Sequence, residues 1–142
     1  MQKKSLLKIL VICTGNSARS QMAEGFLKYY KKEWEIYSAG TKPKGLNPLA
    51  VEVMSEKGIN IADFKSKSIV LFLNKKFDYV ITVCDNAKES CPIFPGNAKY
   101  IHWSLKDPAA PEGTKEEKLN AFRKTRDKIH NKIIHNKILE FI

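Results

Sequence analysis

The stretch VICTGNSARSQMAEG, residues 11–25, joins an apolar run to an amphipathic pattern. The run at 6–12 is short, apolar and rich in branched residues, so it predicts a buried β-strand. Residues 17–32 repeat apolar side chains at steps of three and four, which predicts a helix. Cys13 therefore stands at the end of a strand, and a turn of only a few residues leads from it into a helix.

This turn has the composition of an anion-binding loop. Successive backbone N–H groups at a helix N-terminus can surround an anion, and Gly15 and Asn16 tolerate the positive φ angles that such a loop often needs. Arg19 could hold an oxyanion through two parallel hydrogen bonds, which a lysine cannot do equally well. The expected substrate-binding residues are Thr14, Gly15, Asn16, Ser17, Ala18, Arg19 and Ser20.

Cys13 would lie at the floor of this loop and act as a nucleophile. The same amides and the helix dipole would stabilise its thiolate and lower its pKa below the free value of about 8.5. Ser20 could hydrogen-bond the sulfur. The alternative is a buried structural cysteine before an ordinary turn, and the spacing of Cys13 and Arg19 alone leaves it open.

Three later runs of apolar residues predict further strands, at 35–38, 79–83 and 99–103. Strands that alternate with helices predict an α/β fold, with a central four-stranded parallel sheet flanked by helices on both faces. No repeat, low-complexity tract or linker divides the chain. A single domain over residues 1–142 is therefore expected.

The expected helices carry clear end signals. Asn47 can cap a helix that has Pro48 at its first position and Gly58 just past its end. Residues 68–75 are ambiguous between helix and strand, and a short helix is favoured. A capping box at 114–117 begins a long terminal helix. The apolar face of that helix is expected to comprise Leu119, Phe122, Ile129, Ile133, Ile134, Ile138 and Phe141.

Cys84 and Cys91 flank a polar segment that follows the strand at 79–83. Cys84 lies at a strand end, where parallel sheets bind ligands, and an exposed, mobile loop is expected between the two thiols. Such a pair suits disulfide exchange. Zinc held by both thiols and His102 is a competing interpretation, but the gap exceeds the usual two to four residues and no fourth ligand is evident. Inert buried thiols are the third interpretation.

Asp107 precedes Pro108 in a loop after the strand at 99–103. A carboxyl group there could protonate a departing oxygen if it faced the Cys13 loop. By itself an Asp-Pro pair is usually only a turn. Its significance therefore depends on the presence of Cys13 and Arg19.

The composition limits the classes of partner and compartment. The chain has 25 Lys+Arg and 15 Asp+Glu, a net charge of +10, which favours an anionic partner. The lysine-rich terminal helix makes nucleic-acid binding worth considering. It has an apolar face, however, and no recognised binding motif, so no nucleic-acid partner is expected. Three cysteines are an odd number for a secreted disulfide framework, so reduced thiols are expected. No stretch approaches the ~20 apolar residues of a membrane span, and a soluble, cytoplasmic protein is expected.

Four segments of the chain resemble the thioredoxin-coupled arsenate reductases, which share the fold of the low-molecular-weight protein tyrosine phosphatases. The segments are VICTGNSARSQMAEG at 11–25, YSAGT at 37–41, VCDNAKESCP at 83–92 and HWSLKDPA at 102–109. They occur in family order, from the first strand almost to the last helix. All three cysteines, Arg19 and Asp107 fall where that family would have them.

The resemblance implies a relay of three cysteines. Cys13 would attack arsenate while Asp107 protonates the leaving oxygen. Cys84 would then attack Cys13, arsenite would leave, and a Cys13–Cys84 disulfide would form. Cys91 would next attack Cys84, giving a Cys84–Cys91 disulfide that thioredoxin reduces. The implied enzyme serves arsenic detoxification, takes its reducing equivalents from thioredoxin and needs no bound cofactor, and nothing in the chain demands more than a monomer.

A plain phosphatase of the same fold is the alternative. It would need only Cys13, Arg19 and Asp107, which leaves the other two cysteines without a role. Its members typically carry aromatic residues after the Asp-Pro pair and a proline after the Arg-Ser of the loop. The residues found here are Ala109, Ala110, Gln21 and Met22. A weak phosphatase side activity is expected.

Some reductases of this type bind a potassium ion beside the loop. Asn16, Glu24 and Ser38 stand where its ligands would be expected, but Lys65 and Lys67 occupy the stretch where an acidic residue would complete the site. A lysine ammonium group paired with Glu24 could replace the cation. No required metal is therefore expected.

Overall fold

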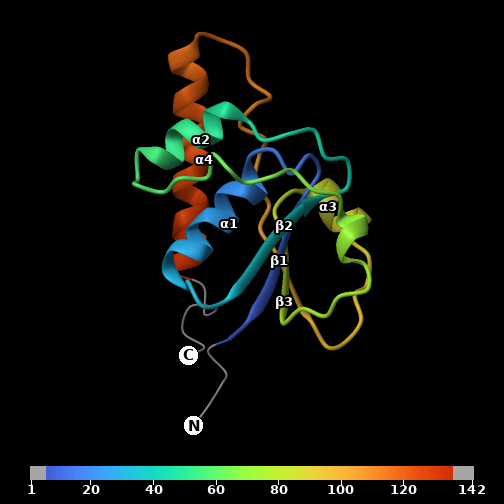
Figure 1. Cartoon of the computed structure of the whole chain (residues 1–142). Coiled ribbons are helices and arrows are strands. Elements are labelled where there is room, and N and C mark those ends of the chain that lie inside the picture. Colours follow the sequence, from blue (N-terminus) through green and yellow to red (C-terminus); the bar gives the residue numbers. More distant parts are fainter. Residues whose placement is uncertain (1–5, 136–142) are drawn as a thin grey trace.

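The central strand of the sheet is the apolar run that ends at Cys13. In the computed structural model, which describes residues 6–135, β1 (Lys8–Cys13) lies between β2 (Glu35–Gly40) and β3 (Tyr79–Thr82), and β4 (Lys99–His102) pairs with β3. The order is β2-β1-β3-β4, and all pairs are parallel. Figure 1 shows the strands running in one direction. The predicted four-stranded parallel sheet is confirmed.

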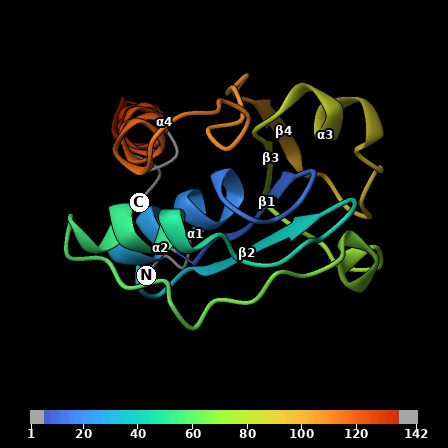
Figure 2. The same cartoon turned by 90° about the horizontal axis from the view of Figure 1, so that it is seen from above.

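Helices cover both faces of this sheet. They are α1 (Arg19–Tyr30), α2 (Pro48–Ser55), the 3₁₀ helix η1 (Ile69–Phe72), α3 (Asp85–Ser90) and α4 (Lys115–His135). Figures 1 and 2 place α1, α2 and α4 on one side of the sheet and α3 on the other. Within residues 6–135, no helix is long and apolar enough to cross a membrane.

The hydrophobic core lies between the sheet and its helices. Ile9 to Ile12 of β1 are fully buried because a central parallel strand is covered on both faces. The buried apolar residues of α4 are Leu119, Phe122, Ile129 and Ile133. Ile134 was expected among them but is 40% exposed, because it lies one step around the helix from Ile133. Ile138 and Phe141 lie outside the described residues.

Several element ends differ from the sequence-based prediction. The first strand begins at Lys8 and not at residue 6, and α1 is shorter at each end than residues 17–32. The second strand continues to Gly40 because Gly40 pairs with Cys13 of β1. The ambiguous segment 68–75 contains the short helix η1, and Ser68 before it forms an isolated parallel bridge with Gly40.

Two of the predicted helix signals are present as hydrogen bonds. The Asn47 side chain accepts a bond from the Leu49 N–H at 2.8 Å, which caps α2. At the start of α4, the Glu117 N–H donates to Thr114 Oγ1 and the Thr114 N–H donates to Glu117 Oε1. This reciprocal pair is the predicted capping box.

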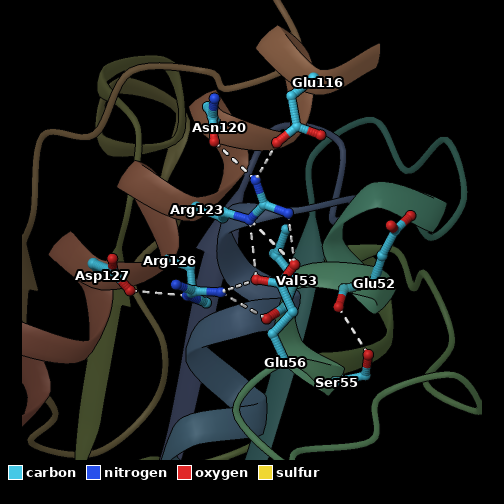
Figure 3. A network of polar contacts seen from close by, with 9 residues as sticks. All are labelled: Glu52, Val53, Ser55, Glu56, Glu116, Asn120, Arg123, Arg126 and Asp127. Carbon is cyan, nitrogen blue, oxygen red and sulfur yellow. Dashed lines mark hydrogen bonds and ion pairs between the residues drawn. The ribbon is translucent and has the colours of Figure 1, made fainter.

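A charged cluster joins the end of α2 to α4 (Figure 3). Arg123 contacts both carboxylate oxygens of Glu56 at 2.8–3.1 Å, and the nearly buried Arg126 donates to Glu56 and to the carbonyl of Val53. These guanidinium hydrogen bonds lower the pKa of Glu56 to about 2. The cluster therefore ties the end of α2 to α4. At the start of α2, the Asn47 N–H donates to the carbonyl of Ser17 in the Cys13 loop at 2.9 Å.

Candidate active site

The loop that links β1 to α1 runs from Thr14 to Ala18. Asn16 has φ 47°, a left-handed conformation that asparagine tolerates better than most residues. Ala18 occupies the N-cap position of α1, and no side chain there bonds the first-turn amides. The start of α1 thus presents N–H groups that an anion can accept from.

The sulfur of Cys13 lies beside the backbone of this loop. The Asn16 N–H donates to it at 3.2 Å, and Ser20 Oγ lies 3.0 Å from it. The predicted contact between Ser20 and the sulfur is present. Both partners can donate hydrogen bonds, so they are placed to stabilise a thiolate at this position.

The Asn16 side chain anchors the loop from its buried side. Its Nδ2 donates to Ser20 Oγ at 2.8 Å and to Ser38 Oγ at 2.9 Å, and its Oδ1 accepts from the Lys67 N–H at 2.8 Å. Asn16, Ser20 and Ser38 are fully buried. Asn16 and Ser20 are both among the expected substrate-binding residues, and their side chains support the loop from its buried side.

The buried hydrogen-bond chain ends in an ion pair. Ser38 Oγ donates to Glu24 Oε1 at 2.6 Å, and Lys28 Nζ lies 2.7 Å from Glu24 Oε2. The structure therefore brings Asn16, Ser38 and Glu24 together as expected, but Lys28 and not Lys65 or Lys67 pairs with the carboxylate. Lys67 Nζ donates to the carbonyl of Lys65, and burial lowers its pKa.

A cavity of about 460 Å³ opens in front of the loop. Five of the predicted substrate-binding residues line it together with Cys13: Thr14, Gly15, Ser17, Ala18 and Arg19. Asp107 also lines it, so the structure brings Cys13, Arg19 and Asp107 to one cavity. Arg19 Nη1 donates to the carbonyl of Leu105 at 2.8 Å, and the Asp107 carboxylate accepts from the Ala109 N–H.

The cavity has further lining residues that the sequence analysis did not single out as site residues. They are Lys42, Lys44, Asn47, Asn86 and Ala109. Lys42 and Lys44 belong to the segment after β2, whose backbone N–H groups donate to the carbonyls of Thr14 and Gly15 at 2.8 and 3.0 Å. No local sequence pattern signals this contact, because it depends on the pairing of β1 with β2.

Gly40 allows this close approach of the two segments. A Cβ atom on Gly40 would lie 2.6 Å from the carbonyl oxygen of Thr14 and 2.9 Å from the backbone nitrogen of Asn16. Both contacts are shorter than packing permits. The end of β2 must therefore be glycine for the Cys13 loop to keep its observed shape.

Cys84 stands at the other side of the same loop. Its sulfur lies 3.3 Å from Thr14 Oγ1 and accepts from the Ala87 N–H at 3.4 Å, so Cys84 caps the short helix α3. The segment after Cys84 is therefore helical and not the loop that was expected. Its polar residues form a helix because the Cys84 cap and Asp85 satisfy its first turn.

Asp85 ties the start of α3 to the end of β4. Asp85 Oδ1 lies 2.9 Å from His102 Nε2 and accepts from Ser104 Oγ at 3.0 Å, and His102 Nδ1 lies 2.7 Å from Thr82 Oγ1. The hydrogen bonds from His102 and Ser104 lower the pKa of Asp85. His102 is thus occupied by Asp85 and Thr82, and not by the two thiols of the zinc interpretation.

Cys91 follows α3 and is half-buried. Its sulfur donates to the carbonyl of Pro92 at 3.4 Å, and burial raises the pKa of its thiol. All three cysteines are free thiols. Within the described range 6–135, no cluster of three or more His, Cys, Asp or Glu side chains could hold a metal ion.

Comparisons with known proteins agree with this geometry. The model of the family described as low molecular weight phosphotyrosine protein phosphatase matches residues 8–136. The arsenate reductase of Shouchella clausii (strain KSM-K16) is 50% identical over 126 residues, which cover 88% of this chain and 91% of that protein.

Solved structures give the same picture. An arsenate reductase in the phosphate binding state superposes with a TM-score of 0.76 at 28% identity, covering 96% of this chain and all of that one. A thioredoxin-dependent arsenate reductase of Corynebacterium glutamicum superposes with a TM-score of 0.60 at 31% identity, covering 91% of this chain and 62% of that one.

Proposed function

The chain belongs to the low molecular weight phosphotyrosine protein phosphatase family, and we propose that within this family it is an enzyme that reduces arsenate to arsenite. One observation carries the proposal. The Cys13 sulfur, held by Asn16 and Ser20, lies at a cavity that Arg19 and Asp107 also line, and Thr14 of the same loop contacts a second thiol, Cys84. Hydrolysis of a phosphate ester does not require that second thiol.

The first step is attack of the Cys13 thiolate on arsenic. The loop amides at the start of α1 and the Arg19 guanidinium hold the oxygens of the arsenate. An S–As bond forms while one As–O bond breaks, and Asp107 gives a proton to the departing hydroxyl group, which leaves as water. Arsenic remains pentavalent in this adduct.

The second step transfers two electrons. The Cys84 thiolate attacks the Cys13 sulfur, the S–As bond breaks, and its electron pair stays on arsenic. Arsenite leaves, and a Cys13–Cys84 disulfide remains. The contact of Thr14 Oγ1 with the Cys84 sulfur supports this order, because it places Cys84 beside the loop that would hold the adduct.

The third step recycles the enzyme. Cys91 attacks Cys84, which releases the Cys13 thiolate and forms a Cys84–Cys91 disulfide for thioredoxin to reduce. α3 separates these two cysteines and has only Ala87 buried, so few contacts oppose its rearrangement. Thioredoxin is the proposed donor because a structural neighbour is described as thioredoxin-dependent.

We assign no bound cofactor or required metal to this cycle. Lys28 already neutralises Glu24, the carboxylate that would otherwise draw a cation to the buried chain behind the loop. Potassium titration of the steady-state rate checks this point, and clear activation by potassium would contradict it.

A phosphatase of the same fold is the second candidate, favoured by the family description and by the Cys13, Arg19 and Asp107 set. Against it, Ala109 lies in the cavity where an aromatic side chain would hold a phosphotyrosine ring. We expect weak hydrolysis of phosphate esters at most.

The decisive experiment follows NADPH oxidation with arsenate, thioredoxin and thioredoxin reductase. We expect turnover by the wild type, none by Cys84→Ser, and no more than one arsenite per enzyme from Cys91→Ser. Both variants should keep any hydrolysis of a phenyl phosphate ester, which controls for folding and for an intact Cys13 loop. Rapid ester hydrolysis by a wild type that ignores arsenate would identify a phosphatase instead.

A further inference from the structure

The cavity in front of the Cys13 loop is larger than its proposed substrate requires. Its volume of about 460 Å³ lies in the range of pockets that bind organic ligands, roughly 300–1,000 Å³. A single tetrahedral oxyanion held by the loop amides and Arg19 would fill only the inner part. Beyond the loop residues, the cavity lining includes Lys42, Lys44, Asn47 and Asn86.

Two lysines in the cavity lining carry positive charges that no contact within the described part of the chain neutralises. Lys42 and Lys44 are exposed, and neither ammonium group has a hydrogen-bond or ion-pair partner among residues 6–135. The charged residues that line the cavity are three cations, Arg19, Lys42 and Lys44, and one anion, Asp107. The lining therefore keeps an excess of positive charge even when Asp107 is ionised.

The two lysines are fixed in place through the backbone. The N–H groups of Lys42 and Lys44 donate to the carbonyls of Thr14 and Gly15, within the anion-binding loop itself. The aliphatic part of the Lys44 side chain packs against Gly15. A Cβ atom added to Gly15 would lie 2.9 Å from Lys44 Cε. These hydrogen bonds fix the backbone of both lysines beside the loop, and their side chains line the cavity in front of it.

We propose that Lys42 and Lys44 form a second anion subsite, and that the ligand class using both subsites is a small phosphomonoester with a further acidic group near its ester oxygen. The phosphate would lie in the Cys13 loop, and the carboxylate or second phosphate would lie between the two lysines. Ala109 leaves the opposite wall without an aromatic surface, so an aryl substituent gains less there than an acidic one. This inference goes beyond the proposed function and shares with it only the oxyanion site in the Cys13 loop.

Calorimetry on the reduced full-length protein tests the subsite without requiring turnover. The probes are inorganic phosphate, methyl phosphate and 2-phosphoglycolate, at low ionic strength. Two ion pairs at a partly exposed site predict that 2-phosphoglycolate binds about tenfold more tightly than methyl phosphate. The ratio should fall toward one in the double variant Lys42→Gln/Lys44→Gln and also at high salt.

A matched control removes two positive charges elsewhere. Lys118 and Lys124 are exposed on α4 and line no part of this cavity. The double variant Lys118→Gln/Lys124→Gln should keep the wild-type ratio, because it changes the net charge equally but not the subsite. An equal loss of the ratio in both double variants would mean a general charge effect and would overturn the proposal.

The outcomes separate this inference from the proposed function. If phosphate binds, arsenate is reduced and 2-phosphoglycolate binds no better than methyl phosphate, only the second subsite is wrong. If neither phosphate nor 2-phosphoglycolate binds, both the inner and the outer subsite are wrong. If the tenfold preference is found in a protein that does not reduce arsenate, the subsite stands and the proposed reductase does not.

Discussion

The segments around Cys13 and Cys84 both follow a buried strand of the same sheet, but the protein holds them in different ways. Buried side chains fix the Cys13 loop from behind, and backbone hydrogen bonds from the segment after β2 fix it from the side. The segment after Cys84 is a six-residue helix with a single buried residue, held mainly at its first turn. A loop proposed to bind an anion gains from rigidity, whereas the proposed relay requires the Cys84 thiol to reach two partners and therefore a segment that can move.

The largest expected effect in this comparison comes from removing the anchor of the rigid loop. Asn16→Ala deletes the buried side chain that pairs with Ser20, Ser38 and the Lys67 N–H, and places alanine at a positive φ. Unpaired buried polar groups predict a loss of about 3 kcal/mol in the free energy of unfolding. Urea denaturation measures it. The exposed Asn131→Ala should stay within about 0.5 kcal/mol, and an equally mild Asn16→Ala would show that the loop is not held by this network.

The next effect tests the contact between β2 and the loop. In Gly40→Ala the added methyl group would lie 2.6 Å from a backbone oxygen, so the loop must shift. We expect a cost of about 2 kcal/mol from overpacking and at least a tenfold fall in kcat/KM for arsenate.

Gly25→Ala in α1 is the matched control for this substitution. Its methyl group would meet side-chain atoms of Ile61 and Met54 instead of backbone. Its arsenate kinetics should therefore stay close to wild type. Unchanged kinetics in Gly40→Ala would mean that the loop does not need the observed close approach.

A smaller effect is expected in the segment after Cys84. Asp85→Ala removes the contacts of α3 with His102 and Ser104, which leaves its first turn less restrained. The rate at which iodoacetamide labels Cys84 should rise about two- to fivefold, since local opening would cost less. Peptide mapping by mass spectrometry measures the rate. Asp63→Ala, at an exposed position, is the control, and an equal rate in both variants would show that packing alone holds α3.

The smallest effect concerns the charged cluster of Glu56, Arg123 and Arg126, which lies outside the segments around Cys13 and Cys84. The pKa of Glu56 is about 2 in the folded protein and about 4.5 without its arginine partners. Because the folded value is lower, the Glu56 carboxylate stabilises the fold above pH 4.5, and this contribution is lost as the pH falls from 4.5 toward 2. In Glu56→Gln that part of the pH dependence should be missing from urea-denaturation curves. A variant whose stability falls as steeply as that of the wild type over this range would contradict the assignment.

The sequence by itself determined the order of the elements and the position of the central loop. The apolar run before Cys13, the helical repeat after it and the caps at Asn47 and Thr114 are local patterns, and each appears in the structure. The parallel sheet followed from the alternation of strands and helices, and it brought Cys13, Arg19 and Asp107 to one cavity.

Only the tertiary structure decided which residues complete the site. Lys42 and Lys44 reach the loop because β2 pairs with β1. The inward direction of Asn16 depends in the same way on its distant partner Ser38. Hydrophobic periodicity in the sequence indicates which nearby residues share one face of a helix or strand. Contacts between distant segments depend on strand order and register, and no short stretch of sequence encodes these alone.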